Sequence, residues 1–270
     1  MKFSVCSEFF EGWKWEDVFS YAAKTGYDGV ELAHFTICDS VEDVSQIERT
    51  RLKDAAARAG IEVAGIHWVL ISPKGLHVSH PDKAVRAKTA AYFHALIDFC
   101  ADLGGRVIVI GSPKNRNVLD PLTPEQAWDF ARETFAQCCD HAGERDVMLC
   151  IEPLGSDQTD FINRPDQGLS FVHAVDHPNF QLILDVYSMN CEKVDMAQAI
   201  QDCAEHLAHF HANDDNKSWP GSGSVDYAPV AQALKQIEYR HYASVEVFDF
   251  KPDPETIAGS AIRFLRGTFG

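Results

Sequence analysis

The sequence predicts a single domain, spanning residues 1–270, that folds as a (β/α)8 TIM barrel of eight parallel strands each followed by a helix. Three observations support this prediction. Short apolar runs alternate with amphipathic stretches along the whole chain. The 270 residues correspond to about 34 per repeat if there are eight, which is the size of one strand–helix unit. The first apolar run is followed by no glycine-rich turn, which a doubly wound open sheet would normally carry.

The expected strands are short runs rich in Val and Ile. Most are continuously apolar rather than alternating, as in a parallel sheet that is covered on its outer face. The eight runs are 2–6, 29–33, 62–68, 106–111, 147–152, 181–186, 207–212 and 242–247. The longest expected loops, 153–165 and 213–225, follow the fifth and seventh of these runs.

The expected helices are indicated by apolar spacing and by residues that start or stop a helix. In the first, an i, i+3, i+4 apolar pattern begins at Trp15 and stops at Gly26. The second ends at Gly60, and the fourth begins at Thr123-Pro124, a capping residue followed by proline. The other expected helices are 81–104, 165–176, 195–205, 226–237 and 253–266.

The composition is that of an ordinary globular protein and limits the classes of partner. The formal net charge is −16 and the sequence pI is about 5.1, whereas nucleic-acid phosphates need clustered Lys and Arg. No apolar run reaches the roughly 18 residues that span a membrane, and the first residues resemble no signal peptide. The eight cysteines include no CxxC pair, which is typical of reduced, buried thiols. We therefore expect a cytoplasmic protein with no nucleic-acid or membrane partner.

Each of the last four expected strands carries one potential metal ligand. Glu152 and Asp185 lie at the ends of strands five and six, and His211 and Glu246 lie in strands seven and eight. They are separated by 33, 26 and 35 residues, each close to one strand–helix unit. In this fold the active site lies where the carboxyl ends of the strands meet. Four such side chains favour one shared site, because four separate buried polar groups would be costly.

Three carboxylates and one imidazole form a donor set that consists mostly of oxygen. Such a set favours Mn²⁺, Mg²⁺ or Co²⁺ over the sulfur-rich environment of a structural zinc site. Four protein ligands leave about two positions of an octahedron for a substrate that binds through two oxygens.

Five segments resemble the sugar isomerase/epimerase family with the xylose isomerase-like barrel, and its ketose 3-epimerase branch in particular. They are IEPLG (151–155), LDVYSMN (184–190), HFHANDDNK (209–217), GSGSVDY (221–227) and SVEVFDF (244–250). The resemblance covers essentially the whole chain. It implies a metal-dependent isomerase or epimerase that acts on a small carbohydrate, in a family whose members commonly form homo-oligomers.

The resemblance also assigns roles to the four ligand candidates. It implies one divalent ion, often Mn²⁺, held by Glu152, Asp185, His211 and Glu246. Charge on an enediolate of the ketose would be stabilised by this ion. Glu152 and Glu246 would be the catalytic pair, one removing the proton alpha to the carbonyl and the other returning it. Return to the opposite face gives an epimer, and return to the neighbouring carbon gives an aldose–ketose isomer.

Five further residues are candidate substrate contacts: His67, Lys217, Trp15, Phe248 and Ser188. His67 ends the third strand, and Trp15 and Phe248 correspond to sugar-packing aromatics in the epimerase branch. Trp15 is nearly as well interpreted as the first core residue of its helix. The branch usually has His at Ser188, Arg at Lys217 and Glu at Gln158. These departures leave the substrate and the reaction open.

Three other functions stay open from the sequence. A lyase acting on a keto-inositol or a 3-keto-sugar would use the same enediolate chemistry. An abasic-site endonuclease of the same superfamily would need a multi-metal cluster with more histidines, and the charge of −16 argues against a DNA partner. A non-catalytic sugar- or metal-binding protein would not need both Glu152 and Glu246.

Overall fold

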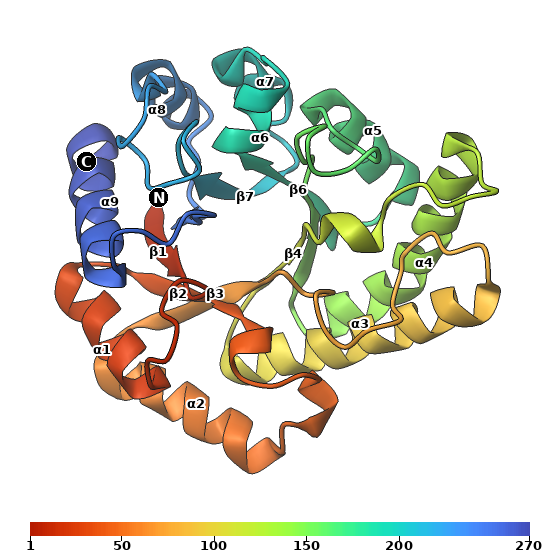
Figure 1. Cartoon of the computed structure of the whole chain (residues 1–270), viewed down its shortest axis with the longest axis horizontal. Helices are drawn as coiled ribbons and strands as arrows, with labels where there is room; N and C mark the ends of the chain where they lie inside the picture. Colours follow the sequence, from red (N-terminus) through yellow and green to blue (C-terminus); the bar gives the residue numbers. More distant parts are fainter.

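The computed structural model describes residues 1–270 and forms a closed barrel of eight parallel strands, which confirms the predicted fold. Each strand pairs with the next one along the chain, and β1 pairs with β8 to close the ring (Figure 1). The strands are β1 (Lys2–Cys6), β2 (Gly29–Ala33), β3 (Glu62–His67), β4 (Val107–Ile110), β5 (Met148–Ile151), β6 (Phe180–Asp185), β7 (Leu207–Ala212) and β8 (Tyr242–Val245). All eight coincide with the predicted runs to within two residues.

The helices surround the barrel and begin and end close to the predicted positions. They are α1 (Trp15–Thr25), α2 (Gln46–Ala59), α3 (Lys83–Leu103), α4 (Pro124–Glu144), α5 (Pro165–Val175), α6 (Val186–Cys191), α7 (Met196–Asp202), α8 (Tyr227–Gln236) and α9 (Pro254–Phe269). Gly26 and Gly60 end α1 and α2 with φ of +105° and +74°, a conformation that glycine adopts without a steric cost.

One helix was not predicted. The short α6 follows β6 without a loop, where Val186 and Tyr187 resemble the continuation of a strand. Asp185 caps this helix, because its Oδ1 accepts a hydrogen bond from the backbone N–H of Ser188 at 2.7 Å. The chain therefore turns at Asp185, and that carboxylate is fixed at the end of β6.

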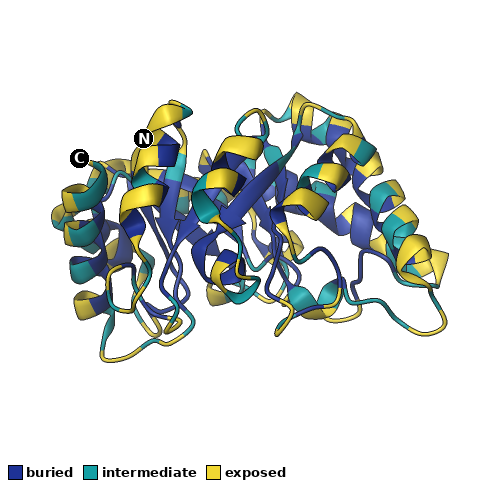
Figure 2. Cartoon of the chain, turned by 90° about the horizontal axis from the view of Figure 1, so that it is seen from above, coloured by how far each residue is buried: buried dark blue, intermediate teal, exposed yellow.

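Two apolar clusters hold the barrel together. The larger cluster lies between the strands and the helices, which expose only their outward faces (Figure 2). The smaller cluster consists of Val107, Val109, Cys150, Ile183 and Ala208. Along each strand these residues alternate with members of the larger cluster, so their side chains point into the barrel. The alternation also places several polar side chains inside the barrel, since Glu31 lies between Val30 and Leu32 of the larger cluster.

Two long segments without helix or strand follow β5 and β7, as predicted, and both continue from carboxyl ends of strands. Residues 68–82, after β3, form a third such segment that is longer than either and was not among the predicted long loops. All eight cysteines are free thiols. None of the helices combines the length and the apolar character that a membrane crossing needs.

Candidate metal centre and active-site pocket

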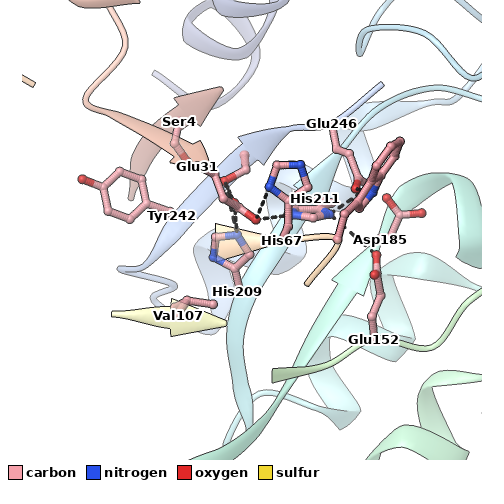
Figure 3. Close-up of polar contacts among 12 residues, drawn as sticks. Ser4, Glu31, His67, Val107, Glu152, Asp185, His209, His211, Tyr242 and Glu246 are labelled. Carbon is pink, nitrogen blue, oxygen red and sulfur yellow. Dashed lines mark hydrogen bonds and ion pairs between the residues drawn. The ribbon is translucent and has the colours of Figure 1, made fainter. Parts of the chain in front are cut away.

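The structure brings together the four side chains that the sequence predicted as metal ligands (Figure 3). Glu152 follows β5, Asp185 ends β6, His211 lies in β7 and Glu246 follows β8. One ligand atom of each lies within 4.8 Å of the others, and all four residues are at most 2% exposed. The register of the parallel strands produces this convergence, because Asp185 and His211 pair directly across β6 and β7. These four groups could hold a single metal ion.

Hydrogen bonds fix the orientation of these groups. Nδ1 of His211 faces two carboxylate oxygens, Oε2 of Glu246 at 3.0 Å and Oε1 of Glu152 at 3.6 Å. Asp185 is held on both sides, since one oxygen caps α6 and the other accepts from the side-chain amide of Asn213 at 2.6 Å. The free lone pairs of the carboxylates therefore converge near Nδ1 of the imidazole.

The charges at this centre are not balanced by protein groups alone. Burial, together with the charges of Glu152 and Glu246, raises the pKa of Asp185 to about 7. Burial also raises the pKa of Glu152. Burial acts to lower the pKa of His211, but the charges of Glu246 and Glu31 outweigh it and raise that pKa well above its ordinary value. Three carboxylates share one imidazole here, and a bound cation would offset the remaining negative charge.

A cavity of about 540 Å³ opens onto Glu152 and Glu246. Trp68 and Phe248 line it, and their rings are stacked with centroids 6.3 Å apart and an interplanar angle of 11°. Nε1 of Trp68 donates to Oε1 of Glu246 at 2.8 Å, so an aromatic wall of the cavity also orients this carboxylate. The volume lies within the range of about 300–1,000 Å³ that is usual for small-molecule sites.

Of the five predicted substrate contacts, only Phe248 lines this cavity. Gln158 lines it as well. Ser188 is buried in the first turn of α6, and its hydroxyl has no hydrogen-bond partner. Lys217 does not line the cavity. Its side chain is half exposed, and its Nζ lies 3.7 Å from Oδ2 of Asp157. Gln158 also has an unpartnered buried amide nitrogen, so two unpaired polar groups remain near the site.

His67 and Trp15 do not reach the cavity. His67 is completely buried inside the barrel, where its Nε2 donates to Oε2 of Glu8 at 2.9 Å. Trp15 begins α1 and packs on Phe19 with ring centroids 5.8 Å apart, beside a different hollow. The geometry of Trp15 therefore matches the alternative interpretation, in which it is a core residue of its helix.

The sequence analysis missed two residues that contact the predicted ligands. Trp68 was included in the third strand but not identified as a contact of Glu246. Glu31 was not identified at all, although it is a carboxylate in the apolar run GVELA, the same signal that identified Glu152. It is completely buried, and its Oε1 accepts from Nε2 of His211 at 3.1 Å (Figure 3).

Arg116, in the segment between β4 and α4, is a third missed residue and is only 1% exposed. Its guanidinium donates to the carbonyl oxygens of Ile110 and Ile162 at 3.1 and 3.2 Å. These contacts tie the end of β4 to the long loop after β5. Burial lowers the pKa of Arg116 to about 10, while the negative charge of Glu152 acts in the opposite direction.

Comparisons with known proteins agree with this architecture. The chain is 27% identical to a probable ketose 3-epimerase of Synechocystis sp., over 94% of this chain and 91% of the relative. It is 30% identical to a D-psicose 3-epimerase of Agrobacterium fabrum, over 84% and 76% of the two chains. A crystal structure of a D-psicose 3-epimerase determined with D-fructose superposes with a TM-score of 0.89 at 24% identity, over 100% of both chains. Residues 19–268 match the model of the xylose isomerase-like TIM barrel family, and the chain belongs to this family.

Proposed function

We propose that this protein is a divalent-metal-dependent epimerase of a ketose or a related keto-sugar. The observation that carries the proposal is the convergence of Glu152, Asp185, His211 and Glu246 on one point, two of them, Glu152 and Glu246, lining a cavity. The names of the two sequence relatives, a ketose 3-epimerase and a D-psicose 3-epimerase, support this reaction class. The cytoplasmic location and the homo-oligomeric state stay predictions from the sequence.

The donor set fits a hard divalent cation, for which we propose Mn²⁺, with Mg²⁺ or Co²⁺ as substitutes. Glu152, Asp185, Glu246 and Nδ1 of His211 would hold it. When bound, such an ion polarises the substrate carbonyl and stabilises the negative charge that develops on its oxygen.

Glu152 and Glu246 are placed to move the proton. They follow β5 and β8 and both line the cavity, so they reach a bound sugar from different strands. One carboxylate would take the proton from the carbon next to the carbonyl, leaving an enediolate, and the other carboxyl group would return a proton to the opposite face. Burial raises the pKa of Glu152, which makes its carboxylate a stronger base for proton abstraction.

We propose Phe248 as a sugar-packing surface and the unpaired groups of Ser188 and Gln158 as partners for substrate oxygens. Lys217 would reach substrate only after leaving Asp157. His67 would act on substrate only through its neighbours. Because the epimerase branch usually has His, Arg and Glu where Ser188, Lys217 and Gln158 stand, we expect a substrate preference unlike that of the psicose enzymes.

Solvent-deuterium exchange tests the proposal. A panel of ketoses, 3-keto-glycosides and keto-inositols is incubated with the protein and Mn²⁺ in D₂O, and carbon-bound deuterium and product stereochemistry are measured by NMR. We expect deuterium at the inverted carbon of at least one sugar and none with Glu152→Gln. Deuterium with loss of water would identify the lyase instead. Cleavage of abasic DNA without exchange would identify a phosphodiesterase and overturn the proposal.

A further inference from the structure

We propose that Glu31 is a positioning residue, which holds His211 in the orientation and tautomer needed to bind a divalent ion. The inference rests on the proposed function and deepens it, because it concerns how the same site is assembled. Glu31 lies in β2, on the side of the barrel opposite the strands that carry the four ligand candidates. It reaches the centre through the barrel interior (Figure 3).

The two ring nitrogens of His211 face different carboxylates. Nδ1 faces Glu246 and Glu152, at 3.0 and 3.6 Å, whereas Nε2 donates to Oε1 of Glu31 at 3.1 Å. A metal binds an imidazole through a lone pair, so the ring must keep its proton on the other nitrogen. Glu31 accepts a hydrogen bond from Nε2–H and so keeps the proton of the neutral ring on Nε2. The lone pair is then on Nδ1, the nitrogen that faces Glu246 and Glu152.

Glu31 can do this because its own position is fixed on every side. Its second oxygen, Oε2, accepts from Nε2 of His209 at 2.7 Å and from the hydroxyl of Ser244. That hydroxyl is itself hydrogen-bonded to the hydroxyl of Ser4 from β1. All of these side chains are completely or almost completely buried, so water does not compete for the carboxylate. The carboxylate has no freedom to turn away from His211.

The contacts of Glu31 are those of a carboxylate, because both of its oxygens face hydrogen-bond donors on His209, His211 and Ser244. A charged acceptor makes the stronger hydrogen bond to Nε2–H and increases the electron density on Nδ1. His209 makes hydrogen bonds only through Nε2, since its Nδ1 has no partner, so its polar contacts serve this network.

The alternative is that Glu31 only fills the barrel interior. The two roles differ in what a substitution changes. A filling role predicts that Glu31→Gln affects folding stability without a specific effect on metal affinity. A positioning role predicts weaker metal binding by a correctly folded protein, because the amide presents an N–H group to one of its imidazole partners. Losses of about 10- to 100-fold are typical when a carboxylate behind a metal-bound histidine is removed.

The experiment is a titration of the metal-free full-length protein with Mn²⁺, followed by calorimetry, for wild type, Glu31→Gln and Asp102→Asn. Asp102 lies in α3 and pairs with Arg49 and Arg145, so it is a control for losing a carboxylate away from the barrel interior. We expect Kd to rise about 10- to 100-fold for Glu31→Gln and to stay within twofold for the control. The visible absorption of bound Co²⁺ should also shift only in Glu31→Gln.

A folded Glu31→Gln protein with wild-type Kd and Co²⁺ spectrum would overturn the inference, as would equal weakening in the control. If Glu31→Gln does not fold by circular dichroism, Ser244→Ala replaces it, because it removes one hydrogen bond to Glu31 and leaves His209 in place. Its Kd should rise about two- to tenfold, and an unchanged Kd would reject the role. Failure of wild type to bind any divalent ion would instead reject the proposed function itself.

Discussion

The barrel interior contains two groups of buried polar side chains, called here the outer and the inner layer, which differ in how their negative charges are balanced. The outer layer consists of Glu152, Asp185 and Glu246, of which Glu152 and Glu246 line the cavity. The inner layer does not line the cavity and consists of Glu8, Glu31, His67 and His209. His211 connects them, with Nδ1 on the outer layer and Nε2 on Glu31 (Figure 3).

The inner layer balances itself, because each carboxylate accepts hydrogen bonds from imidazoles at 2.7–3.1 Å. The outer layer does not, since three carboxylates share the single imidazole of His211. Burying an unpaired charge is costly, so the outer layer needs a cation from solution whereas the inner layer needs none. An excess of buried negative charge beside a cavity is therefore the feature that distinguishes a binding site from a structural network in this molecule.

The largest expected effect comes from removing one carboxylate of the outer layer. Glu152→Gln and Glu246→Gln should each lower kcat by at least about 10²- to 10⁴-fold, because each removes a group that transfers the proton. Steady-state assays on an identified substrate measure this loss. The metal-free variants should be at least as stable as wild type to heat, because a repulsive charge has gone. Normal activity in either variant would mean that the proton-transfer roles are misassigned.

The imbalance of the outer layer also predicts how metal-free protein responds to pH. Because the pKa of Asp185 is raised from 3.8 to about 7 in the fold, its contribution to stability is complete below about pH 4 and is lost as pH rises through 7. The raised pKa of His211 acts in the same direction. The loss is at most about 4 kcal/mol for Asp185, at 1.36 kcal/mol per pKa unit. Urea unfolding from pH 4 to 8 measures it.

Saturating Mn²⁺ should reverse this slope, because the ion binds the deprotonated ligands. Asp185→Asn should flatten the slope in metal-free protein. A metal-free protein whose stability rises with pH over this range would contradict the assignment of excess negative charge to the outer layer.

Replacing a carboxylate of the inner layer should change the unfolding free energy in the opposite direction, to lower stability. Glu31→Gln should lower the unfolding free energy of metal-free protein by about 1–3 kcal/mol, because it leaves a buried imidazole without its acceptor. Urea unfolding beside Glu152→Gln compares the two layers directly. Equal changes of the same sign in both variants would remove the distinction between a balanced and an unbalanced layer.

The sequence predicted the outer layer well and the inner layer poorly, for a physical reason. Glu152 and Asp185 stand at the ends of apolar strands, and strand ends of a barrel meet at one face wherever the helices lie. Glu31 carries the same signal in the middle of β2, but its partners come from β7 and β8, and only the closed ring brings these strands together. Contacts across a barrel depend on strand register and tilt, which apolar periodicity does not encode.

The aromatic contacts of the site also could not be predicted from the sequence. The sequence predicted Trp15 and not Trp68 as a sugar contact, yet Trp15 packs on Phe19 within α1 and Trp68 lines the cavity. The backbone of Trp68 has φ of +53°, a left-handed conformation just after β3 that strand periodicity does not predict. This turn is what aims the indole at Glu246.

The smallest expected effect comes from removing the hydrogen bond between the indole of Trp68 and Glu246. Trp68→Phe keeps a ring stacked against Phe248 but removes the Nε1–H donor to Glu246, so this carboxylate loses one constraint. We expect kcat to fall about two- to tenfold, as for one lost hydrogen bond to a charged group, with Kd for Mn²⁺ changed less than in Glu31→Gln. Trp128→Phe is the matched control, since Trp128 packs on Phe171 away from the cavity. An equal loss of kcat in both variants would show that aromatic packing, rather than the orientation of Glu246, limits the reaction.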